Sequence, residues 1–290
     1  MGDATAQTWV SAWQTKWMKK RCQRPEAISQ VAGTSVNDNT SIKPKESALQ
    51  PLVRKLSYRT KLDEQDRAAI LALPHTVKSM EAHSYVVREG DRPSHSCLLL
   101  DGFSIRHKCV AGGKRQIMAI HMKGEMVDLE NSFLGHADHN VQMLTAGKIA
   151  MIPKEEVTRI AFERPAVGTA LWLDTLVDAS IFREWIANVG RRDAQTRVAH
   201  VLCEFALRLK HAGLGDESGY HLPMTQEQLA DVTGLTSVHV NRSLKNLEMD
   251  GVISRVSPRE IVISDWKRLA NKGDFDSLYL HFKQGDPALA

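Results

Sequence analysis

The segment from residue 222 to residue 255, with the sequence LPMTQEQLADVTGLTSVHVNRSLKNLEMDGVISR, limits the fold more than any other part of the chain. Thr225 is placed to cap a helix over residues 226–232, and Gln228 holds the position that completes a capping box. Gly234 then allows the left-handed backbone that a tight turn between two helices needs. The segment therefore predicts a short helix that is followed at once by a second one.

The second helix has two different faces. Thr236 or Ser237 caps it, and it ends after Met249. Its apolar face carries residues at four- and three-residue spacing, which are Val240, Leu244 and Leu247. Its opposite face carries polar and basic residues, which are His239, Asn241, Arg242, Lys245 and Asn246. Such a helix rests on a core through one side and presents the other side to a partner.

Two short strands are expected next, over residues 252–255 and 260–263, and Ser257-Pro258 joins them. Two helices, a glycine turn and a trailing hairpin are typical of a winged helix-turn-helix, whose second helix enters the major groove of DNA. The alternative is an ordinary helical hairpin inside a core. The agreement of caps, turn, polar face and hairpin over thirty residues favours the winged form.

The run TQEQLADVTGLTSVHVNRSLKNLE, residues 225–248, resembles the DNA-binding domain of the Crp/Fnr superfamily of bacterial transcription regulators, and the resemblance continues backwards to about residue 50. It implies phosphate contacts from Thr225, Gln226 and Thr236. It implies groove contacts from Ser237, Val238, Asn241 and Arg242, and the same polar face adds His239 and Lys245.

Arg242 matches the arginine with which this family reads guanine, a bidentate contact worth ~1–3 kcal/mol of discrimination. The best-known members carry Arg or Val and then Glu where this chain has Ser237 and Val238. Without that Glu there is no acceptor for a cytosine amino group, so the DNA site cannot be assumed to follow the best-known half-site. Val238 could instead press on a thymine methyl group.

The sequence and the resemblance together predict an α+β protein with an N-terminal jelly-roll β domain, a long dimerisation helix and a C-terminal winged helix-turn-helix. The expected segments are a disordered tail (1–47), a cyclic-nucleotide-binding-like β-roll (48–163), the dimerisation helix (164–190), the winged helix-turn-helix (191–266) and a C-terminal tail that frays after Asp274 (267–290). Within residues 75–153, short apolar runs alternate with turn signals such as Gly112-Gly113, which is typical of a compact all-β unit.

The resemblance raises the question of a cyclic nucleotide. Family members that bind one need a Gly-Glu pair for the ribose and a downstream Arg for the phosphate. Gly124-Glu125 is present, but no Arg lies between Arg115 and Arg159. A buried phosphate without an arginine lacks the charge-assisted bonds that offset its desolvation. We therefore expect no high-affinity binding of cyclic AMP and predict no cofactor.

Histidines and cysteines leave other sensor roles open. His136 and His139 lie three residues apart, but ordinary loop histidines are commoner than ligands, so no metal site is predicted. An iron–sulfur cluster of the oxygen-sensing branch needs several N-terminal cysteines, and only Cys22 lies there. Cys97 and Cys109 are expected close together on neighbouring strands, either as redox-active thiols or as small buried hydrophobes.

Pro165 begins a long helix that has two apolar stripes. The first stripe contains Val167, Leu171, Val177, Ile181, Trp185 and Val189, and we assign its first five residues to dimerisation. The second contains Leu173, Leu176, Phe182 and Ile186. A helix with two apolar faces needs two partners, which are expected to be its own β-roll and the same helix of a second subunit. Gly190 is expected to break the helix, and residues 191–193 to form a hinge before a helix over 194–211.

Composition agrees with a globular protein, since 42% of the 290 residues are hydrophobic and 25% are charged. Residues 191–265 hold nine Lys or Arg and ten Asp or Glu, so the net charge of this segment is no evidence for nucleic-acid binding. The phosphate-driven affinity of one subunit should be modest, and dimerisation should therefore contribute more to DNA binding. Tryptophan recurs at every fourth position near the N-terminus, at Trp9, Trp13 and Trp17. This spacing suggests either an amphipathic helix that contacts a membrane surface or a partner, or sequence that precedes the first domain. No signal peptide or apolar run of ~18 residues is present, so we expect a cytoplasmic protein without a membrane partner.

The resulting hypothesis is a homodimeric transcription regulator that binds double-stranded DNA, with RNA polymerase as the expected further partner. The alternative is a ligand- or redox-sensing β-roll whose DNA-binding head is degenerate. No glycine-rich phosphate loop, nucleophile elbow or metal-ligand spacing favours an enzyme.

Overall fold

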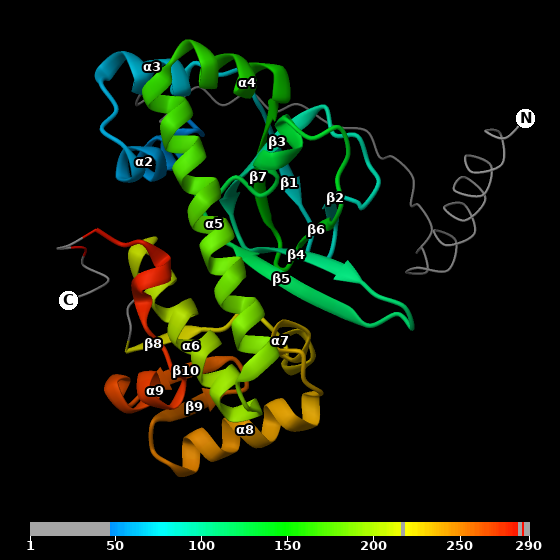
Figure 1. Cartoon of the computed structure of the whole chain (residues 1–290), viewed down its shortest axis with the longest axis vertical. Helices are drawn as coiled ribbons and strands as arrows, with labels where there is room; N and C mark the ends of the chain where they lie inside the picture. The colour runs from blue at the N-terminus through cyan, green and yellow to red at the C-terminus, as the bar shows by residue number, and fades with distance from the viewer. Residues whose placement is uncertain (1–46, 216–217, 284–285, 287–290) are drawn as a thin grey trace, which may run out of the picture. The chain divides into compact units, whose positions relative to one another are not determined.

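The computed structural model describes residues 47–215, 218–283 and 286, and Figure 1 shows the order of its elements. The N-terminal tryptophans and Cys22 lie outside the described residues. Among the residues it describes, no helix is both long and apolar enough to cross a bilayer.

The β-rich domain contains two sheets, with strand orders β1-β7-β3 and β2-β6-β4-β5. Their strands are β1 (Thr76–Met80), β2 (Tyr85–Val87), β3 (His95–Asp101), β4 (Ser104–Cys109), β5 (Arg115–His121), β6 (Asn140–Met143) and β7 (Gly147–Pro153). Leu99, Val141 and Ile149 belong to one of its buried cores. The predicted β-roll is therefore confirmed, and the short helix η1 (Leu129–Ser132) follows β5.

Helices flank the roll in sequence. They are α2 (Gln50–Arg59), α3 (Glu64–Leu71), α4 (Lys154–Glu163) and the long α5 (Pro165–Arg191). Leu56, Ile70 and Val167 from these helices share one core with Leu98 and Ile152 from the strands. This shared apolar core fixes α2, α3 and the first turns of α5 on the β-roll.

A glycine allows α4 and α5 to pack closely. A Cβ atom at Gly168 would lie 2.2 Å from the carbonyl oxygen of Ala161, so no other residue fits there without a shift of backbone. The expectation that Gly190 breaks α5 was wrong. The helix continues to Arg191, because Arg192 still donates its N–H to the Asn188 carbonyl before the chain turns extended.

The C-terminal head begins with α6 (Ala194–His211), whose cap is Asp193. It continues with β8 (Gly219–His221), α7 (Gln226–Thr233), α8 (Ser237–Met249), β9 (Ile253–Ser257), β10 (Glu260–Ile263) and α9 (Trp266–Lys272). The three strands form one sheet in the order β8-β10-β9. The predicted helices and wing strands are therefore present, and α6 is the buried helix on which α7, α8 and α9 pack.

Residues 275–283, the part of the expected fraying tail that the structure describes without a gap, are ordered. They form the short helix η2 (Ser277–Leu280), and Tyr279 stacks on His200 of α6 with 5.8 Å between ring centroids. The Tyr279 hydroxyl donates to Glu204 at 2.8 Å. Further along, the backbone N–H of Lys283 donates to the Tyr58 hydroxyl on α2. The Tyr279 side chain and the Lys283 backbone therefore hold this segment against α6 and α2.

Asp128 is a buried carboxyl group whose protonation links stability to pH. Its Oδ1 accepts hydrogen bonds from the Cys97 N–H at 2.6 Å and the Ser96 hydroxyl at 3.2 Å, and no part of the residue is exposed. Burial raises the pKa of Asp128 from 3.8 to about 7, against the opposing effect of the Cys97 N–H. The folded chain therefore holds this proton more tightly than the unfolded chain, and stability falls as the pH rises from about 4 to about 7.

We predict that Asp128→Asn, which keeps the Oδ1 acceptor and removes the charge, raises the free energy of unfolding at pH 8 by at least about 1 kcal/mol. The gain should shrink steadily when urea unfolding is repeated at pH 6 and pH 5. Asp101→Asn, at the exposed end of β3, is the control and should show no such trend. An equal effect of Asp128→Asn at every pH would contradict the assignment.

Candidate DNA-binding surface

The turn between α7 and α8 forms as its residues predict. Thr225 Oγ1 accepts from the Gln228 N–H at 3.2 Å and Gln228 Oε1 accepts from the Thr225 N–H at 2.8 Å, which completes the capping box. Gly234 has a φ of 64°, in the left-handed region, where glycine is favoured. Thr236 then caps α8 by accepting from the His239 N–H at 3.4 Å.

The two faces of α8 are used differently. Val240, Leu244 and Leu247 are buried in the same core as α6. The opposite face is open and forms a shallow hollow lined by Gln226, Ser237, Val238, Asn241, Arg242, Lys245, Asn246 and Met249. Val238 is 66% exposed there and Met249 is 85% exposed. The surface holds six of the nine predicted DNA contacts, and the other three, Thr225, Thr236 and His239, are exposed but do not line it.

Hydrogen bonds fix several of these side chains before any partner binds. Asn241 Nδ2 donates to Gln226 Oε1 at 3.0 Å, which ties α8 to the first residue of α7. His239 Nδ1 lies 2.9 Å from Thr236 Oγ1, so His239 supports the cap and its ring does not extend freely from the surface. Ser237, Val238 and Arg242 are the other exposed residues in the N-terminal half of α8.

The acidic residues at the end of α8 are neutralised within the head. Glu248 receives two hydrogen bonds from Arg255, at 2.8 and 2.7 Å, and Asp250 pairs with Lys272 at 2.8 Å. The hydrogen bond from Arg255 holds the pKa of Glu248 below its usual range, and that from Lys272 does the same for Asp250. The near-neutral head therefore presents Arg242 and Lys245, which make no ion pair within the described residues, on a locally basic face.

Two contacts that the sequence did not reveal hold the turn in place. Arg197 Nη1 of α6 donates to the Thr233 carbonyl at 3.2 Å. Gln116 Nε2 of β5 donates to the Val232 carbonyl at 3.2 Å. Both satisfy carbonyl groups at the end of α7. Gln116 is 116 residues away from Val232, so no local pattern could have identified it.

The structure corrects the assignment of the first α5 stripe to dimerisation. Its members lie inside their own chain, with Val167, Leu171, Val177 and Trp185 buried and Ile181 packed against the core of the head. Trp185 Nε1 also donates to Glu204 at 2.8 Å. The exposed apolar side chains of α5 come mainly from the second stripe, where Trp172 joins Leu176, Phe182 and Ile186.

The residues considered for other ligands are separated or already paired. Glu125 contacts Lys55, Arg208 and His121 at 3.3, 3.3 and 3.4 Å. Cys97 lies on β3 and Cys109 on β4, which belong to different sheets, so the expected neighbouring strands were wrong.

Within the described residues, no three His, Cys, Asp or Glu side chains form a group suited to a metal. Burial raises the pKa of Cys97 and of Cys203, so these thiols stay protonated near neutral pH.

Two families match the chain. Residues 77–164 match the cyclic nucleotide-binding domain, and residues 196–272 match the Crp-like helix-turn-helix domain. The transcriptional activator protein FnrL of Cereibacter sphaeroides is 24% identical over 228 residues, which cover 78% of this chain and 91% of that protein. The nitrogen fixation regulation protein FixK of Bradyrhizobium diazoefficiens is 28% identical over 156 residues, or 54% of this chain and 65% of that protein.

Solved structures share the fold. FixK2 from Bradyrhizobium japonicum superposes with a TM-score of 0.64 and 24% identity, over 69% of this chain and 97% of its own. A CooA mutant from Carboxydothermus hydrogenoformans gives a TM-score of 0.57 and 18% identity, over 69% and 88%. The β-roll, long helix and helix-turn-helix thus occur together in other proteins.

We predict opposite effects for alanine at two glycines. Gly234→Ala places a Cβ in the left-handed conformation and should lower the free energy of unfolding by ~1–2 kcal/mol. Gly190→Ala, in helical α5 with open space around a Cβ, should raise it by ~0.5–1 kcal/mol. Urea unfolding of both variants tests the pair. A loss of stability at Gly190 as large as that at Gly234 would contradict the local argument.

Proposed function

This chain belongs to the Crp/Fnr superfamily of transcription regulators, and we propose that it binds a two-fold symmetric DNA site as a homodimer. The observation that carries the proposal is the open face of α8, which is capped, held by α6 and α7, locally basic and unused by the described chain. A helix of this kind fits the major groove through its N-terminal half. The groove contacts come from Ser237, Val238, Asn241 and Arg242.

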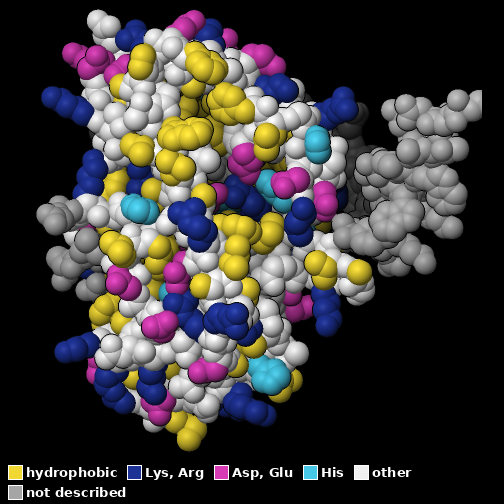
Figure 2. Space-filling model, viewed as in Figure 1, with side chains coloured by type: hydrophobic (Ala, Val, Ile, Leu, Met, Phe, Trp, Pro, Cys, Tyr) yellow, Lys and Arg dark blue, Asp and Glu magenta, His cyan; other side chains and the backbone are white. Residues whose placement is uncertain are grey.

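The second subunit is proposed to pack along α5. Four exposed apolar residues fall on one side of this helix, and Figure 2 shows hydrophobic side chains gathered where α5 crosses that view. They are Trp172 at 67% exposed, Leu176 at 46%, Phe182 at 41% and Ile186 at 56%. A two-fold pairing of the same stripe covers all of them at once. The pairing also sets the distance between the two α8 helices, which must be about one turn of DNA, ~34 Å, for both to enter the major groove.

We propose that the regulator works without cyclic AMP or an iron–sulfur cluster. Supporting this, Glu125 is committed to three side chains of its own protein and is not free to accept from a ribose. RNA polymerase is the proposed partner at promoters, and the cytoplasm is the proposed location. The alternative, a sensor whose head is degenerate, is disfavoured by the intact caps and turn.

We predict that Arg242→Ala abolishes sequence preference. Fragments first selected from random duplex DNA by the native protein should bind the variant no better than scrambled duplexes, a loss of ~1–3 kcal/mol in discrimination per half-site. The dimer and its thermal stability should not change, because Arg242 is exposed and makes no ion pair within the described residues.

Lys267→Ala is the control for this experiment, because Lys267 is exposed on α9, away from the hollow. It should retain the preference of the native protein. If Arg242→Ala kept full selectivity, the degenerate-head alternative would be favoured instead.

The dimer is tested separately. Leu176→Glu places a charge in the exposed stripe and should convert the protein to a monomer in sedimentation velocity, with loss of operator binding. Val77→Glu is the matched control, because Val77, on β1, is 47% exposed and Leu176 is 46% exposed. A dimer that persists with Leu176→Glu would show that α5 does not form the interface.

A further inference from the structure

The chain after α9 runs back from the head to the helices that flank the β-roll. We call residues 275–283 the strap, which includes η2 and is drawn in red in Figure 1. The match to the Crp-like helix-turn-helix domain ends at residue 272, so the strap lies outside both matched domains. It contacts α6 in the head and also α5 and α2.

The first attachment of the strap is to α6. The Tyr279 hydroxyl donates to Glu204 at 2.8 Å and lies 3.0 Å from His200 Nε2. Phe275 packs edge-on against the His200 ring, with 5.2 Å between ring centroids. Glu204 and His200 are both buried. Burial, together with the nearby Glu204, raises the pKa of Tyr279, so its hydroxyl stays protonated and remains a donor.

Contacts, and not local preference, determine the conformation of the strap. A Cβ atom at Gly273, just before it, would lie 2.8 Å from the His200 backbone nitrogen, so the chain touches the backbone of α6 there. Asp274 and His281 have φ angles of 44° and 53°, in the left-handed region. Residues other than glycine rarely adopt this conformation, and it persists where the surroundings hold it.

The second attachment is to α5 and α2. The helix η2 packs against α5, where His281 Nε2 lies 3.3 Å from Ser180 Oγ. Leu280 is buried. The Lys283 N–H donates to the Tyr58 hydroxyl on α2, and the Lys283 ammonium group lies 5.0 Å from the centre of the same ring. The strap therefore joins the end of the head to two helices outside it.

The head is thus attached at both of its ends. At its start, Arg192 Nη1 lies 2.7 Å from Glu184 of α5 and Arg192 Nη2 lies 3.0 Å from Asp274. At its end, the strap supplies the attachment. A body that is held at one point can rotate about that point, whereas a second attachment elsewhere removes much of this freedom.

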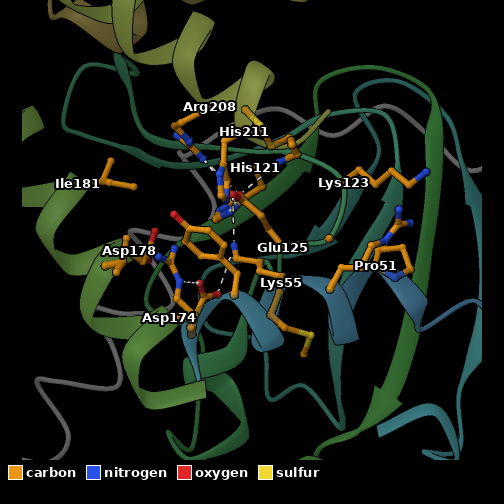
Figure 3. Close-up of a pocket in the computed structure, with 18 of the residues that line it drawn as sticks. Pro51, Lys55, His121, Lys123, Glu125, Asp174, Asp178, Ile181, Arg208 and His211 are labelled. Carbon is orange, nitrogen blue, oxygen red and sulfur yellow. Dashed lines mark hydrogen bonds and ion pairs between the residues drawn. The ribbon is translucent and has the colours of Figure 1, made fainter. Parts of the chain in front are cut away.

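Glu204 connects the strap to a contact between α6 and the β-roll. Glu204 accepts from Tyr279 and also from Arg208 Nη1, at 3.1 Å. Arg208 Nη2 lies 3.3 Å from Glu125, and Figure 3 shows Arg208 and Lys55 pointing toward this carboxylate. Tyr279 therefore helps to hold Glu204 where it keeps Arg208 against the roll.

We propose that the strap fixes the orientation of the head and thereby makes DNA binding strict in the distance between half-sites, a role that rests on the proposed function. Tyr279 is its main positioning residue. The residues that line the α8 hollow all lie between positions 226 and 249, outside the strap, so it acts on the direction of α8 and not on base contacts. One added base pair moves a half-site by ~3.4 Å and turns it by ~35°, which a head of fixed orientation cannot follow.

The test uses full-length protein and the DNA that the native protein selects, with one base pair added between the half-sites. The native protein should lose affinity at least about tenfold, as for a mismatched half-site. Tyr279→Ala should lose at most about threefold, because its heads can turn to follow the half-sites. Tyr279→Phe, which keeps the ring without the hydroxyl, should fall between them. The matched control is Leu278→Ala, in the same short helix but 78% exposed, and it should behave as the native protein does.

Two outcomes overturn the proposal. One is the native loss of affinity in folded Tyr279→Ala, and the other is a native protein that tolerates the added base pair. Circular dichroism shows whether each variant is folded. If Tyr279→Ala is not, Tyr58→Phe decides, because it removes only the hydroxyl to which the Lys283 N–H donates at the other end of the strap. It should at least halve the loss, and an unchanged loss overturns the proposal.

A second measurement needs no DNA. Trypsin cleaves after Arg191 and Arg192 in the hinge more readily when the hinge opens. Fragments identified by mass spectrometry should appear at least about threefold faster from Tyr279→Ala than from the native protein or Leu278→Ala. Equal rates overturn the strap as a second attachment. If the native protein selects no DNA at all, the proposed function fails, whereas the cleavage rates still decide whether the strap holds the head.

Discussion

The burial of one face of α8 against α6 is the interaction on which the functional surface depends. Val240, Leu244 and Leu247 enter the core that α6 provides, whereas Val238 and Met249 of the same helix stay exposed. Its polar face has no place in that core, because burying unpaired polar groups costs free energy. The helix must therefore present Ser237 and Arg242 outward, and the cap at Thr236 fixes where that surface begins.

The same helix α6 also connects the head to the rest of the described chain. Phe205 packs against Phe103 of the roll at 5.8 Å between ring centroids. Glu204 accepts from Trp185 of α5, from Arg208 and from Tyr279. A buried carboxylate with three donors resists rearrangement unless its partners move together. A rearrangement of α5 or of the C-terminal segment would therefore disturb the hydrogen bonds of Glu204 in α6.

Local chemistry explains which parts of this structure the sequence predicts. Caps and turn residues act within four positions, so Thr225, Gly234 and Pro165 located the helix ends correctly. The two stripes of α5 are similarly apolar, and only tertiary packing decides that Trp185 points inward and Ile186 outward. The bond between Arg208 and Glu125 spans 83 residues, and the docking of Tyr279 on His200 spans 79. The hydrophobic periodicity of the sequence carries no information on contacts over such separations.

Footprinting of the protein on DNA that it has selected is the measurement that tests the central claim most directly. If two α8 helices of one dimer enter the major groove, guanine methylation should be blocked in two major-groove patches about 10 base pairs apart, related by two-fold symmetry. Each patch should disappear when the groove face of α8 is altered. A single protected patch, or protection confined to the minor groove, would contradict the account.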